Sequence, residues 1–313
     1  MGTSLESCLD RGLDFLHRAQ LPHGELRAQS LRCGNPAGEV WKDDGAVFVT
    51  ALIVHSLGLV DEPRAESMIW RALGFLRAEM RDSGLWAYWT RANGRYIPPD
   101  LDDTAYISSI LRQYGVAFPD NRELLLNNRD GGGLFQTWIF DPPAEHIVPS
   151  RLPRQIVDPV VNANVLAYLG HHDETECAVT YLNRVAKDLV TSTFYLDEMC
   201  FLYMLSRAYR LGIQALLPAG ESLLVRLSQR WQQGSSGNVL LDALGVCALL
   251  NFSRPDERLP WVIESLVRSQ NDDGSWERFP MYQGGDELYG AAELTSAICL
   301  EALARFRLDE GRR

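Results

Sequence analysis

The sequence predicts an all-α fold, an (α/α)6 barrel that spans residues 1–313 as one domain. Apolar residues recur at helical spacing in segment after segment, and strand-like alternation is nearly absent. The predicted helices are of two kinds, which alternate along the chain. Helices that are apolar on every side must be buried, whereas helices with one charged face lie outside. The alternation therefore indicates an inner ring of helices wrapped by an outer ring.

The first kind of helix is apolar almost all round and opens with polar N-cap residues, which assigns it to the inner ring. We expect six inner helices, at Asp44–Leu57, Asp103–Tyr114, Asn162–Leu169, Asp197–Leu211, Asn238–Asn251 and Ala291–Phe306. The second kind carries a clear charged face. We expect six outer helices, at Leu5–Arg18, Ala65–Arg81, Asn121–Asn128, Thr175–Leu189, Gly220–Gln232 and Leu259–Ser269.

A short repeat follows several outer helices. Gln270–Trp276 is matched by Gln20–Leu26, with Gln, three residues, Gly, one residue and a bulky apolar side chain. Looser copies lie at Gly84–Trp86 and Gly133–Phe135. Gly permits the tight turn that ends one helix, and the bulky side chain can cover the end of the next. We interpret the repeat as a structural staple between neighbouring helices.

The bulk composition excludes several classes of protein. The formal charge of −11, spread along the chain, argues against a nucleic-acid partner. The six cysteines form no CxxC pair and lie mostly in apolar stretches, which predicts buried free thiols in a reducing compartment. The N-terminus lacks a signal-peptide pattern, and no apolar run has the length of a membrane span. We expect a cytoplasmic protein, which leaves room for a peripheral membrane contact.

The segment Asp100–Ala105, read as Asp-Leu-Asp-Asp-Thr-Ala, together with the repeat and the six helix pairs resembles squalene-hopene cyclase and other class II terpene cyclases. The resemblance covers one barrel of that family, the acid-bearing one, from about Leu5 to Phe306. It implies an isoprenoid cyclase of the terpene cyclase and prenyltransferase fold type. The resemblance further implies Asp102 as the acid that protonates an alkene or epoxide, with Asp100 and Asp103 as its hydrogen-bonded support.

Physical chemistry agrees with this assignment. An alkene is a poor base, so its proton donor must be held neutral, and neighbouring carboxylates raise the pKa of a carboxyl group. A helix N-terminus instead favours the ionised form, so we expect Asp103 to take the capping role. The competing interpretation is that Asp100, Asp102 and Asp103 only cap a helix.

A carbocation needs aromatic faces around it and no nucleophile nearby. The aromatic residues that precede the inner helices resemble the cavity lining of the family and would gather at one mouth of the barrel. We expect a substrate site lined by Trp41, Trp86, Tyr88, Phe194, Tyr195, Phe279, Tyr282 and Tyr289. Core packing is the alternative for each of them. Asn164 stands where the family carries a histidine that supports the acid; an amide can orient the carboxyl but cannot share its proton.

The expected substrate is a linear isoprenoid, and a lone barrel favours a C15 or C20 prenyl diphosphate over squalene. Protonation itself requires no cofactor and no metal. A diphosphate would need magnesium or cationic contacts, for which the candidates near the mouth are Lys42, Arg91, Arg95, Arg151 and Arg154. Because the second barrel of the family is absent, we expect a partner, most simply a second copy of the chain, to close the cavity.

Two alternatives stay open. Protein prenyltransferase β subunits share the barrel but bind zinc through Asp, Cys and His, and this sequence has no histidine after His172. The other alternative is a non-catalytic protein that binds an isoprenoid in its barrel or acts as a scaffold.

Overall fold

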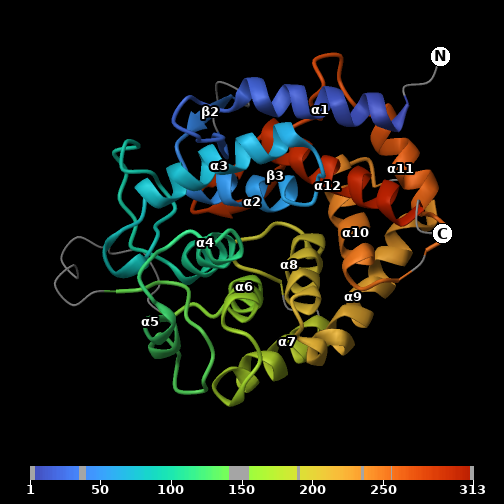
Figure 1. Cartoon of the computed structure of the whole chain (residues 1–313). Helices are drawn as coiled ribbons and strands as arrows, with labels where there is room; N and C mark the ends of the chain where they lie inside the picture. Colours follow the sequence, from blue (N-terminus) through green and yellow to red (C-terminus); the bar gives the residue numbers. More distant parts are fainter. Residues whose placement is uncertain are drawn as a thin grey trace.

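A computed structural model of the chain describes residues 4–34, 40–140, 155–188, 191–233, 236–254 and 256–310 (Figure 1). Six helices of this part form an inner ring: α2 (Val47–Leu57), α4 (Leu101–Gln113), α6 (Pro159–Leu169), α8 (Glu198–Arg210), α10 (Val239–Asn251) and α12 (Ala292–Glu310). Each inner helix packs against the next, and α12 packs against α2 and closes the ring. Their side chains supply most of the apolar core.

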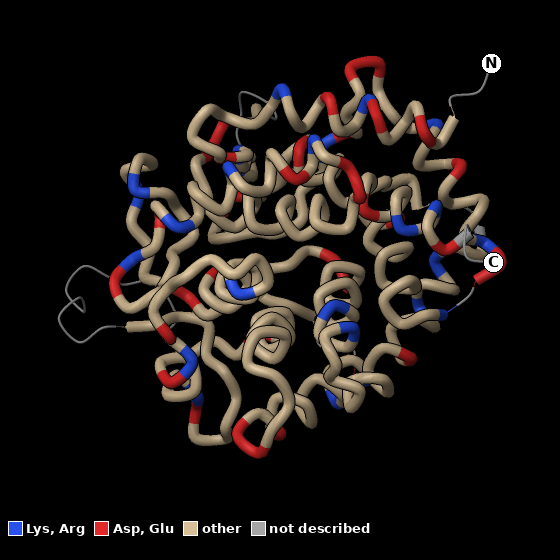
Figure 2. The backbone as a smooth tube through the Cα atoms, viewed as in Figure 1, with Lys and Arg blue, Asp and Glu red and all other residues tan. Residues whose placement is uncertain are grey.

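The outer helices alternate with the inner ones along the chain: α1 (Leu5–Ala19), α3 (Pro63–Ala78), α5 (Arg122–Asn127), α7 (Glu176–Asp188), α9 (Leu217–Arg230) and α11 (Leu259–Arg268). Short 3-10 helices lie at η1 (Asp82–Gly84), η3 (Asp173–Thr175), η4 (Gln214–Leu216) and η5 (Trp231–Gln233). The predicted α/α barrel is confirmed. Charged residues lie mainly toward the periphery of the molecule (Figure 2), and none of the described helices is long and apolar enough to cross a membrane.

Four inner helices begin at a capping side chain, and the sequence predicted that residue correctly for α8 and α10. The expected start of α6 at Asn162 is wrong, since the helix begins at Pro159. Asp158, Asp197 and Asn238 accept hydrogen bonds from backbone N–H groups in the first turns of α6, α8 and α10. In α4 the cap is Asp100, whose Oδ1 lies 2.8 Å from the backbone nitrogen of Asp103. The expectation that Asp103 caps this helix is therefore wrong; the helix starts at Leu101, so Asp103 already lies within its first turn.

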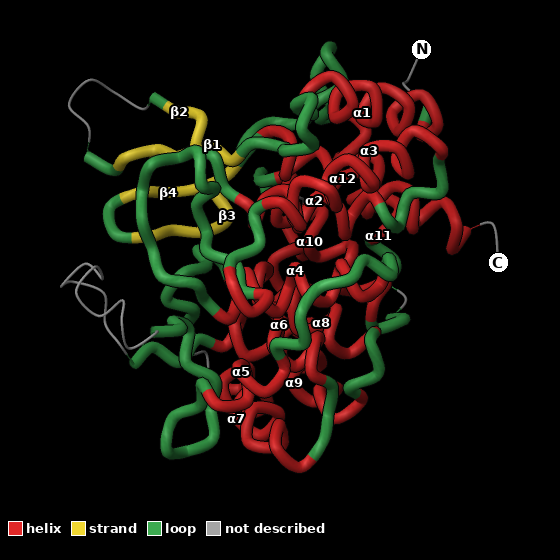
Figure 3. Tube along the Cα trace, turned by 60° about the vertical axis from the view of Figure 1, so that its left-hand side comes forward, coloured by secondary structure: helices red, strands yellow, loops and turns green. Residues whose placement is uncertain are grey.

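A small antiparallel sheet, which the sequence did not predict, lies on one side of the helical body (Figure 3). Its strands are β1 (Ala28–Arg32), β2 (Trp41–Asp44), β3 (Pro280–Gly284) and β4 (Glu287–Gly290), in the order β2-β1-β4-β3. The central pair joins the two ends of the chain, with Gln29 opposite Gly290. Each strand is only four or five residues long, too short for a clear alternating pattern.

The repeated Gln-Gly motif connects neighbouring helices, as predicted. Gln20 donates from Nε2 to the carbonyl oxygens of Gly24 and Met68, at 3.0 and 2.9 Å. Gln270 likewise donates to Gly274 and Cys8, at 3.0 and 2.9 Å. Gly24 has φ +103°, and a Cβ there would overlap the carbonyl oxygen of Arg71, so only glycine fits this turn.

The cysteines follow the prediction in part. Cys8, Cys200, Cys247 and Cys299 are buried free thiols, whereas Cys33 and Cys177 are exposed. The expectation of buried thiols is therefore wrong for these two.

Candidate active site

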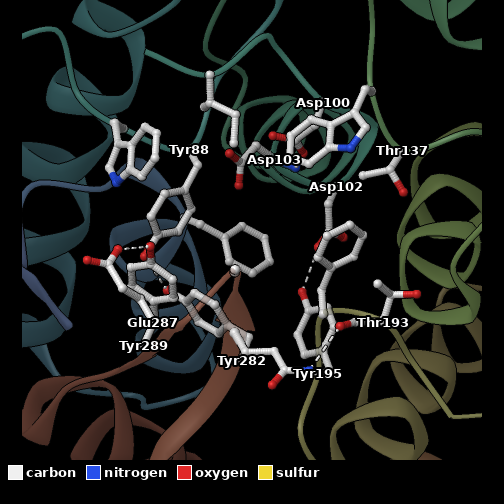
Figure 4. Close-up of a pocket in the computed structure, with 18 of the residues that line it drawn as sticks. Tyr88, Asp100, Asp102, Asp103, Thr137, Thr193, Tyr195, Tyr282, Glu287 and Tyr289 are labelled. Atoms are coloured by element: carbon white, nitrogen blue, oxygen red, sulfur yellow. Dashed lines mark hydrogen bonds between the residues drawn. The ribbon is translucent and has the colours of Figure 1, made fainter. Parts of the chain in front are cut away.

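A cavity of about 990 Å³ opens at the end of the barrel where the inner helices begin (Figure 4). Its wall is formed by the start of α4, the segment that leads into it, the loop before α8, and strands β3 and β4. The volume lies near the upper end of the range of roughly 300–1,000 Å³ typical of small-molecule sites. The sequence placed Asp102 in a pocket at this end, and Asp102 is one of the lining residues.

Backbone hydrogen bonds hold the lining segments together. The nitrogen of Asp100 donates to the carbonyl oxygen of Trp86, at 3.2 Å. The loop before α8 is tied to β3 from both sides, since Gln283 donates to Phe194 at 2.7 Å and Leu196 donates to Met281 at 3.2 Å. Segments far apart in sequence therefore present their side chains to one cavity.

The Asp102 carboxyl is held by two side chains from other elements. The amide of Asn164, on α6, donates to Oδ1 at 2.7 Å. The hydroxyl of Tyr195 donates to Oδ2, also at 2.7 Å. Burial raises the pKa of Asp102 to about 6, and these two hydrogen bonds oppose the rise. The group is thus an acid whose neutral form is accessible close to neutral pH.

Asp100 and Asp103 line the same wall but make no hydrogen bond to the Asp102 carboxyl. Burial, and next the charge of Asp102, raise the pKa of Asp100 to about 7. Burial and the neighbouring Asp100 raise the pKa of Asp103 well above its usual range. The expectation that these two residues support the acid by hydrogen bonds is wrong. They instead form their own pair at the start of α4.

Asp158 positions the loop that carries Tyr195, a role the sequence did not reveal. Its Oδ2 accepts hydrogen bonds from the hydroxyl of Ser192 and the backbone nitrogen of Thr193, both at 2.7 Å. The other carboxylate oxygen, Oδ1, caps α6 through Val160, at 2.8 Å. One carboxylate therefore links the start of α6 to the loop before α8. The loop partners of Asp158 are more than thirty residues away along the chain, so no local pattern points to them.

Three tyrosines form one aromatic wall of the cavity. The ring centroids of Tyr88, Tyr282 and Tyr289 are 5.1 to 5.9 Å apart, and the last two are stacked. Figure 4 shows Tyr88 and Tyr289 across from Asp102, with Tyr282 next to Tyr195, whose ring centroid is 6.0 Å away. Phe48 meets Tyr282 edge-on at 5.9 Å, and Trp138 meets Phe194 edge-on at the same centroid distance. The faces of such rings attract a positive charge that passes near them.

The structure brings most of the predicted site residues together. The cavity is lined by Asp100, Asp102, Asp103, Tyr88, Phe194, Tyr195, Tyr282 and Tyr289, and Asn164 contacts Asp102 from α6. Three predicted lining residues lie elsewhere: Trp41 is on β2 under the guanidinium of Arg278, Trp86 is fully buried with its Nε1 donating to Leu76, and Phe279 packs against the core. Sequence reasoning missed the aromatic lining residues Phe48, Trp89, Tyr96 and Trp138.

The cationic candidates are only partly at the cavity. Arg95 lines it and pairs with Glu287 at 2.6 Å and with Asp44 at 3.4 Å. Arg32, which was not predicted, also lines it and pairs with Asp286 at 3.0 Å. Lys42 and Arg91 are not lining residues, and Arg151 and Arg154 lie outside the described residues. In the described ranges, no group of three or more His, Cys, Asp or Glu side chains could hold a metal ion.

No family model and no curated protein sequence matches the chain. Solved structures do. The type II terpene cyclase MstE from Scytonema matches with a TM-score of 0.73 at 17% identity, over 97% of this chain and 99% of that chain. A protein from Actinoplanes matches with a TM-score of 0.73 at 19% identity, over 96% of this chain and 99% of that chain. A structure of an MstE variant in complex with its substrate, geranylgeranyl dihydroxybenzoate, matches with a TM-score of 0.71 at 18% identity, over 96% and 97%. The chain therefore has a terpene-cyclase-like fold.

Proposed function

We propose that the protein is a class II terpene cyclase, in which Asp102 protonates a linear isoprenoid and starts its cyclisation. One observation carries this proposal: a carboxyl with a raised pKa, held by Asn164 and Tyr195, faces a cavity with an aromatic wall. An acid that still holds its proton in the resting enzyme and a surface that tolerates a carbocation are two requirements of this chemistry. Asp102 is the donor in the proposed site, and Asp100 and Asp103 lie beside it at the start of α4.

The proposed step moves one proton. The O–H bond of neutral Asp102 breaks as the π electrons of the alkene form a C–H bond, which leaves a carboxylate on the enzyme and a cation on the neighbouring carbon. Asn164 favours the proton on Oδ2, because the unprotonated oxygen of a carboxyl is the better acceptor for its amide. The ring faces of Tyr88, Tyr282 and Tyr289 then stabilise the cation along the chain. Loss of one C–H proton from the cyclised cation to water then gives a product that is an isomer of the substrate, and a proton from water restores neutral Asp102.

We propose a C15 or C20 prenyl chain as the substrate. The geranylgeranyl chain bound by MstE supports the longer of the two, and the match over 99% of that chain supports cyclisation by a lone barrel. The head group stays a prediction. Arg32 and Arg95 at the cavity are each paired with carboxylates, so a diphosphate would have to displace these partners or arrive with magnesium.

Closure of the cavity also stays a prediction. Carbocation chemistry must exclude water, and we propose that a second copy of the chain or a separate partner covers the mouth. Light scattering, together with product analysis over a range of protein concentrations, tests this: the ratio of cyclised to water-trapped product should rise with the oligomer fraction. An unchanged ratio across monomeric and oligomeric fractions would contradict closure by a second copy.

The activity is tested by incubating the protein with farnesyl diphosphate, geranylgeranyl diphosphate, squalene and geranylgeranyl dihydroxybenzoate, with and without magnesium. We expect cyclic products from at least one prenyl substrate. Asp102→Asn retains the size and hydrogen bonds of the side chain but cannot protonate an alkene, so turnover should fall by about three orders of magnitude or more while affinity changes little. Asp120→Asn, which removes an exposed carboxylate away from the cavity, is the control and should retain turnover.

The runner-up is a non-catalytic isoprenoid-binding or scaffold protein, which the same experiment separates. Tight binding of prenyl substrates by the parent without turnover would favour that function. Equal turnover by the parent and by Asp102→Asn would exclude protonation by this residue.

A further inference from the structure

A buried arginine lies behind the proposed acid. Arg207, on α8, is 3% exposed, and among the described residues no carboxylate lies within ion-pair distance of it. Its Nη1 donates to the amide oxygen of Asn164 at 3.2 Å, and its Nε donates to His55 at 3.2 Å. The guanidinium carbon lies 3.8 Å from the ring centroid of Tyr106. A buried charge without a counter-ion is costly, so this arrangement calls for a physical reason.

The other groups around Arg207 do not neutralise it. Burial and the charge of Arg207 lower the pKa of His55 well below its usual range, so the imidazole is neutral and accepts from Arg207. Glu301, on α12, is the nearby buried carboxylate, and it binds Arg305 at 3.0 Å, Tyr203 at 2.7 Å and Ser56 at 2.9 Å. Arg305 and Arg210 add positive charge around His55. Arg207 therefore contacts the neutral imidazole of His55 and the amide oxygen of Asn164, and no carboxylate among the described residues pairs with it.

The contact with Arg207 fixes which way the Asn164 amide points. Arginine has only donors, so it can bind the oxygen of the amide but not its nitrogen. The NH₂ group of Asn164 must then point away from Arg207, and it lies 2.7 Å from Oδ1 of Asp102. Two aligned hydrogen bonds thus connect the guanidinium to the acid.

We propose that Arg207 is a positioning residue that strengthens the Asp102 acid through Asn164. This inference rests on the proposed function. Before proton transfer the group Asp102–Asn164–Arg207 carries one positive charge and no negative charge; after transfer it contains a carboxylate and a guanidinium linked by the amide. The arginine gains its counter-ion only as the proton leaves, so the favourable interaction grows toward the transition state. In the class II cyclases that this sequence resembles, a histidine supports the acid. Here the amide of Asn164 and the guanidinium of Arg207 together would supply that support.

The test measures the pKa of the Asp102 carboxyl directly, by infrared difference spectroscopy of the full-length protein against Asp102→Asn as a function of pH. Arg207→Met should raise this pKa by about one unit or more, because a nearby positive charge favours the carboxylate. Arg207→Lys should restore part of the shift. In turnover, Arg207→Met should lower kcat by about tenfold or more with little change in KM, since one pKa unit corresponds to a factor of ten. Arg210→Met, which removes an exposed charge from the same helix, is the matched control and should leave the pKa unchanged.

The pathway through the amide is tested with Asn164→Leu. This variant alone should raise the pKa of Asp102, and adding Arg207→Met to it should have a smaller effect than in the parent. It also keeps the proposal testable where Arg207→Met does not fold. An unchanged Asp102 pKa in the folded Arg207 variants, or an equal shift in Arg210→Met, would overturn the proposal. If the variants show the expected pKa shifts but the parent cyclises none of the substrates, the proposed function is contradicted and the effect of Arg207 on Asp102 stands.

Discussion

The amide nitrogen of Asn164 lies 2.7 Å from Oδ1 of Asp102 and donates a hydrogen bond to it. An amide stays neutral at every pH, so this pair has one titrating member, the carboxyl. Asn164 therefore cannot return a proton to the Asp102 carboxylate after the carboxyl has given its own away. Tyr195, at 2.7 Å from Oδ2, is the contact of Asp102 that can both donate and accept a proton. The pH dependence of the proposed reaction should therefore reflect Asp102 itself.

We expect the turnover rate to fall as the pH rises through about 6. Only the neutral acid can protonate the substrate, and the pKa of Asp102 is raised to about 6. The rate should be constant well below this pH and drop about tenfold per unit above it. A kcat/KM profile measures this limb. Asp100→Asn should leave its position unchanged, because Asp100, with a pKa of about 7, is largely neutral at pH 6. A rate that increases with pH through this range would show that a carboxylate acts as the base instead.

Tyr195→Phe should move the same limb to higher pH. The hydroxyl donates to Oδ2 of Asp102, and a donor to the charged form lowers the pKa of a carboxyl. Removing it should raise the apparent pKa by about one unit and lower the plateau rate by roughly tenfold. Tyr289→Phe removes a hydroxyl that donates to Glu287 instead, so its profile should match the parent. Identical shifts in both variants would mean that the effect comes from the cavity as a whole.

The capping role of Asp100 predicts a difference in stability between neighbours. Asp100→Ala removes the acceptor for the backbone N–H of Asp103 and should lower the free energy of unfolding by about 1 kcal/mol. Asp103→Asn leaves that cap in place and should have a smaller effect. Urea denaturation of both variants measures the difference. A larger loss of unfolding free energy in Asp103→Asn than in Asp100→Ala would mean that Asp103, and not Asp100, caps the helix.

The helices and the place of Asp102 at the cavity could be predicted because their signals are local. The all-apolar and amphipathic helices follow from spacing within ten to twenty residues, and Asp100–Ala105 is a contiguous motif. The support of the acid could not be predicted in full, since Tyr195 is 93 residues from Asp102 and reaches it through a loop held by Asp158. Trp86 shows the limit of aromatic patterns. It precedes an inner helix as Tyr88 does, yet it is fully buried with its Nε1 donating to Leu76, whereas Tyr88 lines the cavity. Two residues apart, the two side chains would share one face of a regular strand, so alternation could not have separated them.

The raised pKa of Asp102 also makes the fold depend on pH, with a sign that can be checked. An aspartate in the unfolded chain has a pKa of about 3.9, and in the folded protein that of Asp102 is about 6. The folded state therefore favours the neutral carboxyl. The stability contributed by this neutral group is fully present below about pH 4, is lost as the pH rises through about 6, and is absent at pH 8.

Asp102→Asn keeps a neutral group at every pH, with an amide oxygen for Asn164. It should therefore be more stable than the parent by about 3 kcal/mol at pH 8 and about equally stable at pH 4. Denaturant unfolding at both pH values measures the difference. Asp286→Asn is the control of opposite sign, because the hydrogen bond from Arg32 lowers the pKa of this exposed carboxyl, so the substitution should bring no gain at pH 8. An Asp102→Asn variant with the stability of the parent at pH 8 would mean that the fold bears no cost for the ionised carboxylate, and the reason for a neutral proton donor at this position would be lost.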